Sequence, residues 1–309
     1  MSHAHPASAG WQRHVAEDLA VTAGFDPAVE ADRRARFLVD QLITTGRRAL
    51  VLGISGGIDS ASAGRLCQLA AEEARHTGHH AKFVAMRLPY GTQQDEDDAQ
   101  LALTFIQPDT VLTVDIRPAS DASLRALATA GLTFRDAHHQ DFVLGNIKAR
   151  QRMIAQYAMA GALDGLVVGT DHAAEAVVGF FTKHGDGAAD IVPLAGLTKR
   201  RVRAVARALG APERLIHKTP TADLEDLAPS KPDEQALGLT YADIDDFLEG
   251  HPVAPDVVDA IIARYRLSAH KRNLPITPRT TLRPEFLEHE NETACPPARK
   301  DSVAAGSTS

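Results

Sequence analysis

The stretch that decides the fold lies at residues 48 to 69 and reads RALVLGISGGIDSASAGRLCQL. Its aliphatic residues 50 to 54 predict a strand buried on both faces of a parallel sheet, because such strands carry almost continuous apolar residues. The next residues, SGGIDS, predict a turn, and the residues after them favour a helix through Ala74. A helix N-terminus attracts anions, and the adjacent Gly56 and Gly57 let a phosphate approach the backbone closely. The stretch therefore predicts a phosphate-binding loop between a strand and a helix.

The loop is not a Walker A motif, because it lacks the lysine of G-x-x-x-x-G-K-[ST] and neither GKS nor GKT occurs in the chain. Its sequence, Ser-Gly-Gly-x-Asp-Ser, resembles that of the pyrophosphate loop of the ATP pyrophosphatase superfamily. In that superfamily the loop binds the β- and γ-phosphates of ATP while a substrate oxygen attacks the α-phosphate, so that an adenylate and pyrophosphate form. The structural alternative is a glycine-rich turn that only packs tightly.

Composition limits the class of protein. A length of 309 residues with 44% hydrophobic content suits one large α/β domain, or one domain with appendages. The formal net charge of -7 argues against a general nucleic-acid or membrane surface. The two cysteines, Cys67 and Cys295, are too few for a disulfide framework or a four-ligand zinc site. The N-terminus has no signal-peptide pattern and no apolar stretch is long enough to span a membrane, so we expect a cytoplasmic protein.

Alternating strand and helix patterns predict the rest of the fold. Further strands are expected at residues 81–88, 110–116 and 165–169. Helices are expected at residues 11–20, 27–44, 93–105, 141–163, 241–248 and 255–266. The fold class is therefore α/β, with a doubly wound, mostly parallel sheet and helices on both faces. We expect a single domain at residues 11–283, between a disordered N-terminus (1–10) and a disordered tail (284–309).

The helix expected at residues 141–163 carries both apolar and basic side chains. Ile154 is among the apolar residues that we expect to face the core. Lys148 and Arg152 are expected to point outward or toward a ligand. Solvated basic residues on a helix are the commoner case.

A group of polar residues follows the strand expected at residues 165–169. In open parallel sheets ligands bind beyond the carboxyl ends of the strands, so these residues would lie beside the phosphate loop. Asp59 and Glu175 would supply two carboxylates, which suit Mg²⁺ held jointly by protein and substrate phosphates. Either carboxylate could instead cap a helix or pair with a lysine. His172 belongs to no zinc motif, and we expect it to form hydrogen bonds rather than to bind a metal.

The residues TKRR at 198–201 break a local rule. Thr198 predicts the N-cap of a helix, but Lys199, Arg200 and Arg201 follow it, and positive charge is unfavourable at a helix N-terminus. Such exceptions concentrate at functional sites. We expect a triphosphate in front of this helix, because its negative charge would offset the unfavourable field.

Seven stretches are similar to those of the ammonia-dependent NAD synthetases, in order over residues 30 to 275: LGISGGIDS, RLPYGTQQDE, FIQPDTVLTVDI, GNIKARQRMIAQY, VVGTDHAAEAVVGFFTKHGDGAADIVPL, KTPTADLEDLAPSKPDE and AHKRNLP. In this family ATP adenylates the nicotinate carboxylate of deamido-NAD, pyrophosphate leaves, and ammonia displaces AMP to give NAD. The resemblance implies the same ligase activity, with ATP, deamido-NAD and ammonia as substrates and Mg²⁺ as cofactor. It also implies a homodimer with the dinucleotide site across the interface.

The resemblance assigns residues to each substrate. The residues at ATP-binding positions are Gly53, Ile54, Ser55, Gly56, Gly57, Ile58, Asp59, Ser60, Thr170, Lys199 and Thr221. The residues at deamido-NAD-binding positions are Arg150, Lys183, Asp190, His270 and Lys271. Asp59 and Glu175 match the Mg²⁺ ligands. Together with Lys199 they are the expected catalytic residues, because they would offset the repulsion between two anionic substrates.

Three alternatives stay open at this point. A glutamine-dependent synthetase needs a glutaminase domain, which the 47 residues before the first strand are too few to form, so free ammonia is expected unless another chain supplies it. A tRNA thiolase or lysidine-type enzyme shares the loop, but its basic RNA surface and reactive cysteines are not apparent. A non-catalytic regulator would bind ATP without releasing pyrophosphate, and the presence of Asp59 and Glu175 argues against it.

Overall fold

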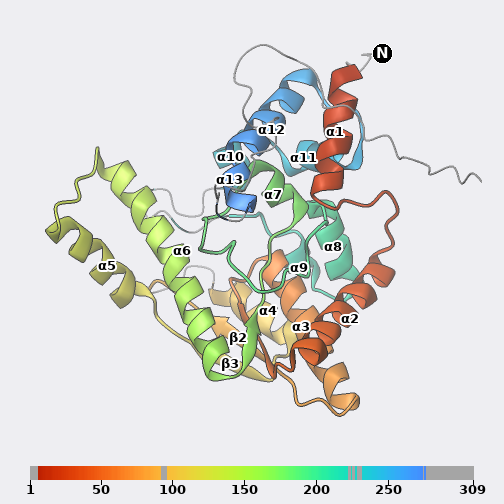
Figure 1. The fold of residues 1–309 in the computed structure, drawn as a ribbon, viewed down its shortest axis with the longest axis vertical. Helices are drawn as coiled ribbons and strands as arrows, with labels where there is room; N and C mark the ends of the chain where they lie inside the picture. The colour runs from red at the N-terminus through yellow and green to blue at the C-terminus, as the bar shows by residue number, and fades with distance from the viewer. Residues whose placement is uncertain are drawn as a thin grey trace, which may run out of the picture.

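A parallel sheet lies in the lower half of the molecule in the view of Figure 1. The computed structural model describes residues 6–91, 96–221, 224, 227, 232–273 and 275. In this part of the chain four strands form the sheet in the order β3-β2-β1-β4. In chain order they are β1 (Ala49–Gly53), β2 (Lys82–Arg87), β3 (Thr110–Thr113) and β4 (Gly165–Val167). All neighbouring pairs are parallel, and Val51 of β1 aligns with Val84 of β2 and Val167 of β4. The expected α/β class is confirmed.

Helices cover both faces of the sheet (Figure 1). One face packs against α2 (Pro27–Thr45), α3 (Ile58–His76), α4 (Glu96–Ile106) and α8 (Lys199–Ala208). The long helix α6 (Ala137–Ala162) covers the other face, and α5 (Arg117–Thr129) packs against α6. Successive side chains of β1 enter different cores: Leu50 and Leu52 lie under α2 and α3, whereas Val51 lies under α6. This strand is therefore buried on both faces, as its apolar sequence predicts.

A third apolar core lies beside the sheet and forms the upper part of the molecule in Figure 1. Its helices are α1 (Pro6–Asp18), α7 (Ala173–Val178), α10 (Asp233–Leu237), α11 (Tyr241–Glu249) and α12 (Pro255–Leu267). Two further helices are short: α9 (Glu213–Ile216) lies between α8 and α10, and α13 (Ala269–Arg272) follows α12. Because α7 follows β4 directly, this core borders the carboxyl ends of the strands. No described helix is long and apolar enough to cross a membrane.

Parts of the fold differ from the sequence-based expectations. Helix α1 begins at Pro6, so residues 6–10 are helical where disorder was expected, and residues 1–5 and the tail 284–309 lie outside the described residues. Ile154 is 51% exposed rather than part of the core. Helix α5 was not predicted, because it buries only Ser120 and carries few of the large apolar residues that identify a packed helix.

Candidate functional site

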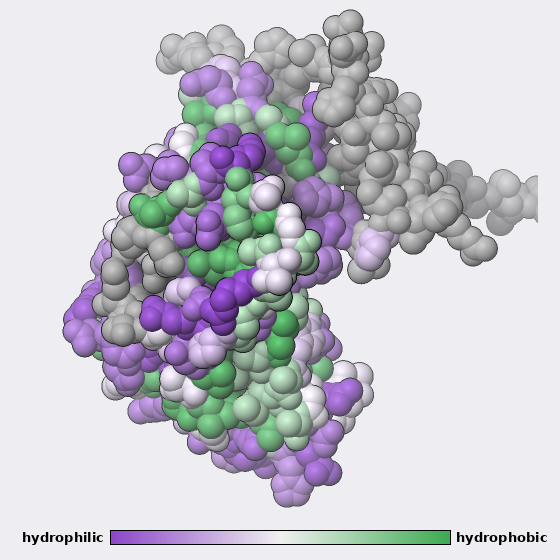
Figure 2. All heavy atoms as spheres, turned by 90° about the vertical axis from the view of Figure 1, so that its left-hand side faces the viewer, coloured by the Kyte–Doolittle hydropathy of each residue, from purple (hydrophilic) through white to green (hydrophobic). Residues whose placement is uncertain are grey.

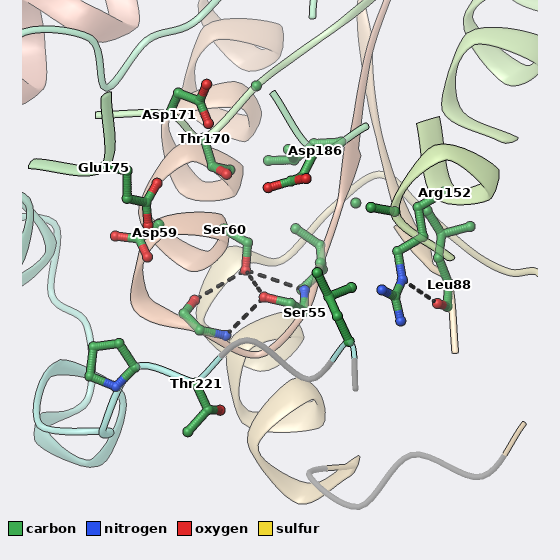
Figure 3. A pocket seen from close by; sticks show the side chains of 18 of the residues that line it. Ser55, Asp59, Ser60, Leu88, Arg152, Thr170, Asp171, Glu175, Asp186 and Thr221 are labelled. Carbon is green, nitrogen blue, oxygen red and sulfur yellow. Dashed lines mark hydrogen bonds between the residues drawn. The ribbon is translucent and has the colours of Figure 1, made fainter. Parts of the chain in front are cut away.

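The phosphate loop joins β1 to α3. It is a tight turn, as its glycines predict. Gly56 has a φ of +86°, and a Cβ at this position would lie 2.9 Å from the backbone nitrogen of Ala99 in α4. The Ser60 hydroxyl accepts a hydrogen bond from the Ser55 amide at 3.3 Å and donates one to the Gly57 carbonyl at 3.1 Å (Figure 3). Gly57 is the N-cap of α3 and provides no side-chain cap. The first N–H groups of α3 therefore remain suited to bind an anion.

The loop forms one wall of a cavity of about 500 Å³ at the carboxyl ends of β1 and β2. Among the described residues, this cavity is lined by every residue predicted to bind ATP except Gly56: Gly53, Ile54, Ser55, Gly57, Ile58, Asp59, Ser60, Thr170, Lys199 and Thr221. Glu175 also lines it. The structure thus brings together residues that are up to 168 positions apart in the sequence, between Gly53 and Thr221.

Four ionisable side chains meet at one end of the cavity. Lys199 Nζ donates a hydrogen bond to Asp59 Oδ2 at 2.7 Å and lies 3.9 Å from Glu175 Oε1. His172 Nε2 lies between the two carboxylates, 3.3 Å from Glu175 Oε1 and 3.5 Å from Asp59 Oδ1. Lys199 and His172 are both 1% exposed. The three residues predicted to be catalytic therefore lie together, with His172 as a fourth member.

Attraction between opposite charges shifts the pKa values of the side chains in this cluster. Burial alone would raise the pKa of Asp59, but Lys199 and His172 outweigh burial and hold the pKa well below its usual range. Burial would lower the pKa of His172, but the attraction of Glu175 and the close approach of both carboxylates to Nε2 outweigh it and raise the pKa to about 9. The pKa of Lys199 is raised for the same reason, because Asp59 and Glu175 outweigh its burial. At neutral pH an ionised Asp59 therefore faces two cations.

Asp59 and Glu175 carry oxygen donors that could hold a Mg²⁺ ion. Ligand atoms of Asp59, His172 and Glu175 all lie within 4.8 Å of one another. Asp59 Oδ1 is buried, and its distance of 3.5 Å from His172 Nε2 is too long for a strong hydrogen bond. Two carboxylates beside a phosphate loop are the oxygen donors that Mg²⁺ prefers. In Figure 3 both carboxylates lie at the same end of the cavity.

The N-terminus of α8 has an explanation other than the expected triphosphate. Thr198 is the N-cap, as predicted, and its side chain accepts from the Arg201 amide. The next N–H groups donate to the carboxylate of Asp245 in α11, at 2.9 Å from Lys199 N and 2.7 Å from Arg200 N. A protein carboxylate therefore occupies the position where we expected a phosphate. The expectation was wrong because a sequence does not tell which anion offsets the charge at a helix N-terminus.

Three of the residues predicted to bind deamido-NAD lie beside the cavity rather than in its described lining. Arg150 on α6 is exposed, and its guanidinium donates to the carbonyl of Lys183 at 3.2 and 3.3 Å. Asp190 is exposed, and one of its oxygens accepts from the Val167 amide at 2.8 Å. Arg150 and Lys183 thus lie in contact, whereas Asp190 accepts a hydrogen bond from the backbone of β4.

The other two, His270 and Lys271, lie on α13 rather than at the end of α12. Lys271 Nζ donates to the carbonyls of Gly179 and Phe181 at 2.7 and 2.8 Å, and His270 is exposed. Neither residue lines the cavity in the described part of the chain. Lys271 is nevertheless held against the segment at residues 179–190. That segment connects it to the cavity, because Phe180, Asp186 and Ala188 are lining residues.

Helix α6 contributes residues that sequence reasoning did not assign to a substrate, although Lys148 and Arg152 were expected to point outward or toward a ligand. Lys148, Arg152 and Gln156 all line the cavity. Gln156 Oε1 accepts from the Gly53 amide at 2.8 Å, at the start of the phosphate loop. Lys148 is 2% exposed, and its Nζ lies 4.1 Å from the centre of the Tyr90 ring. The spacing of four residues, which places these side chains on one face of a helix, is the signal in the sequence that could have found them.

Fold and site together define a nucleotide-binding α/β protein, with a glycine loop and two carboxylates at the carboxyl ends of parallel strands. Residues 30–275 match the family described as NAD synthase, and the chain belongs to this family. A protein of Streptomyces coelicolor, described as an NH(3)-dependent NAD(+) synthetase, is 67% identical over 273 residues, 88% of this chain and 99% of that protein.

Solved structures agree with this assignment. A crystal structure of NAD+ synthetase from Burkholderia pseudomallei is 59% identical, with a TM-score of 0.77, and the match covers 89% of this chain and 100% of that one. The structure of an NMN synthetase from Francisella tularensis is 34% identical, with a TM-score of 0.72, covering 83% of this chain and 100% of that one. The family resemblance found in the sequence is thereby confirmed.

Proposed function

We propose that this protein is an ammonia-dependent NAD synthetase, a ligase that converts deamido-NAD to NAD at the expense of ATP. The observation that carries the proposal is the meeting of the phosphate loop with Asp59, Glu175 and Lys199 in one cavity. The 67% identity to an NH(3)-dependent NAD(+) synthetase supports the choice of reaction. A cytoplasmic location stays a prediction from the sequence.

The reaction needs two displacements. An oxygen of the nicotinate carboxylate forms a bond to the α-phosphorus of ATP, the bond from that phosphorus to the bridging oxygen breaks, and pyrophosphate leaves. The nitrogen of ammonia then bonds to the activated carbonyl carbon, the bond to the AMP oxygen breaks, and the nitrogen loses a proton. Adenylation is required because a free carboxylate repels nucleophiles and has no good leaving group.

The residues of the cavity fit the first displacement. The N–H groups at the start of α3 would bind the departing pyrophosphate, because they face no capping side chain. Lys199 would stabilise the charge that develops on the phosphates. Asp59 and Glu175 would hold Mg²⁺, which when bound neutralises polyphosphate charge. Thr170 and Thr221 line the same cavity and are proposed ATP contacts.

Deamido-NAD is proposed to bind beside this cavity, at Arg150, Lys183, Asp190, His270 and Lys271. In support, Arg150 contacts Lys183, and Lys271 is held against the segment that carries Lys183. These cationic groups would attract the pyrophosphate of the dinucleotide. In the family to which the resemblance points, the dinucleotide site spans two subunits, and we propose the same arrangement here.

Helix α6 offers a surface for a second copy of the chain. Phe142 and Ile154, both on this helix, are 56% and 51% exposed, and Leu127 of the neighbouring α5 is 44% exposed. Figure 2 views the molecule from the side on which α5 and α6 lie in Figure 1, and apolar residues gather on this face. Exposed apolar area of this kind marks interaction sites.

Replacing Ile154 by Asp is therefore expected to convert the dimer to a monomer, because the new carboxylate would be buried in the interface without a partner. Sedimentation at several protein concentrations measures the state. The matched control is Ile43→Asp, which changes a similarly exposed isoleucine, at 48%, on α2. A dimer that survives in Ile154→Asp would contradict an α6 interface, and a wild-type monomer would contradict the dimer itself.

The Francisella neighbour motivates a second candidate, amidation of a mononucleotide in place of the dinucleotide. The activation chemistry would be the same, so the cavity around Asp59 does not distinguish the two. The higher identity to NAD synthetases favours deamido-NAD.

The test measures pyrophosphate and NAD formed by the purified protein from ATP, MgCl2 and deamido-NAD, with ammonium or glutamine as nitrogen donor. We expect NAD with ammonium and no faster reaction with glutamine. Nicotinate mononucleotide is supplied in parallel. A higher kcat/KM with the mononucleotide would favour the second candidate. ATP binding without any pyrophosphate release would instead favour a regulatory nucleotide-binding protein.

A further inference from the structure

The first turn of α8 is held by a buried side chain of α11. Asp245 is 2% exposed, and its two oxygens accept from the backbone N–H groups of Lys199 and Arg200 at 2.9 and 2.7 Å. The Arg200 guanidinium also approaches Asp245 Oδ2, at 3.5 Å. Hydrogen bonds that the N–H groups of a helix N-terminus donate to a carboxylate are strong, because the acceptor is charged and the helix dipole favours it.

Lys199 is the residue whose position depends most directly on this contact. It is the first residue of α8, and its own amide is one of the two donors to Asp245. From this turn its side chain reaches Asp59 at 2.7 Å and passes over the ring of Tyr241, which lies 4.9 Å from Nζ. Tyr241 also belongs to α11. Helix α11 thus contacts both the backbone and the side chain of Lys199.

We propose that Asp245 is a positioning residue for the reaction. By fixing the first turn of α8, Asp245 places the Lys199 ammonium at Asp59 and Glu175. Asp245 is absent from the described lining of the cavity, so it acts through Lys199 and not on a substrate. This inference rests on the proposed function, because its effect on kcat is measured in that reaction. It also means that the helical core outside the sheet contributes to the site, because α11 belongs to that core.

Helix α11 supplies a matched control beside Asp245. Asp246 Oδ1 accepts from the Arg200 guanidinium at 2.6 Å and lies 3.2 Å from His251 Nδ1, and its side chain is 36% exposed. Its bonds reach the side chain of Arg200 and not the backbone of α8. Replacing Asp246 by Asn removes the same charge from the same helix while the amides of Lys199 and Arg200 keep their acceptor.

The experiment is a double-mutant cycle between Asp245→Asn and Lys199→Ala, with kcat and the dissociation constant of MgATP measured for each protein. Asn can accept at only one of its two positions, so one amide of α8 loses its partner. We expect Asp245→Asn to lower kcat by roughly 10- to 100-fold, because small displacements of a catalytic group have effects of this size. In the Lys199→Ala background the same change is expected to alter kcat by less than about twofold, as is Asp246→Asn in the wild type.

Equal losses of kcat in both backgrounds would overturn the proposal, because they would show that Asp245 acts independently of Lys199. A folded Asp245→Asn protein with unchanged kcat would also overturn it. If Lys199→Ala leaves no measurable kcat, the effect of Asp245→Asn on the MgATP dissociation constant is compared in the two backgrounds instead. The same dissociation constants test the role of Asp245 if no NAD forms with any variant. Failure of the proposed function is then distinguishable from failure of this proposal. If Asp245→Asn does not fold, Asp245→Glu takes its place in the cycle.

Discussion

Replacing Asp59 by Asn is expected to lower kcat by roughly 10²- to 10³-fold, the usual size of effect when one preorganised electrostatic contact is removed from an active site. The variant keeps the shape of the side chain but removes the charge that Lys199 contacts at 2.7 Å. It also removes half of the proposed pair of Mg²⁺ ligands. The rate of pyrophosphate release at saturating ATP and deamido-NAD measures the effect, and a titration with MgCl2 is expected to show a higher concentration for half-maximal rate.

The matched control for this prediction is Asp32→Asn, which removes an exposed carboxylate from α2. Its kcat is expected to equal that of the wild type. The stability of both variants is measured by thermal unfolding. Asp59→Asn removes one of the two carboxylates that face Lys199 and His172 and leaves Glu175, so it is expected to unfold at a lower temperature. A folded Asp59→Asn protein with wild-type kcat and an unchanged response to MgCl2 would contradict the assignment of Asp59.

The phosphate loop could be predicted from the sequence because its determinants are local. A buried strand, two glycines and a helix start follow each other within residues 50 to 60, and each has its own physical signature. Glu175 could be predicted for a different reason. The topology of open parallel sheets places the residues after each strand at the same edge, so the end of β4 had to lie near the end of β1.

The environment of Lys199 could not be predicted in full. The unfavourable charges at 199–201 drew attention to Lys199, and the structure places Lys199 in the lining of the cavity. The compensating anion was assigned wrongly, because Asp245 lies 46 positions further along the chain and its contact with α8 depends on how α11 packs. Helical spacing places Asp245, but not Asp246, on the buried face of α11. It does not indicate which group of another helix Asp245 contacts.

The deamido-NAD residues mark another limit of sequence reasoning. Arg150, Lys183 and Lys271 were assigned by family resemblance alone. Their positions beside the cavity, with Arg150 and Lys271 bonded to backbone carbonyls, follow from the packing of α6 and α13 around residues 179–190. No pattern in the sequence specifies such a packing.

Replacing Gly56 by Ala is expected to disrupt the phosphate loop more than any other single methyl group added there. The positive φ of +86° already costs a residue with a side chain roughly 1–2 kcal/mol. The added Cβ would also lie 2.9 Å from the backbone nitrogen of Ala99, so that either the loop or the start of α4 must move. Overpacking of this kind costs about 1–3 kcal/mol more. Because the loop would bind pyrophosphate through its backbone, the displacement is expected to weaken MgATP binding by about 10-fold or more.

Gly78 provides a control with the same backbone geometry. Its φ is also +86°, but a Cβ there would meet nothing within 4 Å. Gly78→Ala therefore carries the conformational cost without the collision, and it lies at the far end of α3 from the loop. Thermal unfolding of the two variants without nucleotide separates the two costs, and calorimetric titration with MgATP measures binding. We expect Gly56→Ala to unfold at the lower temperature and to lose affinity, while Gly78→Ala binds MgATP as the wild type does. Equal unfolding temperatures with equal affinities would show that the loop moves away from α4 without loss, and that its close approach to Ala99 is not required for binding.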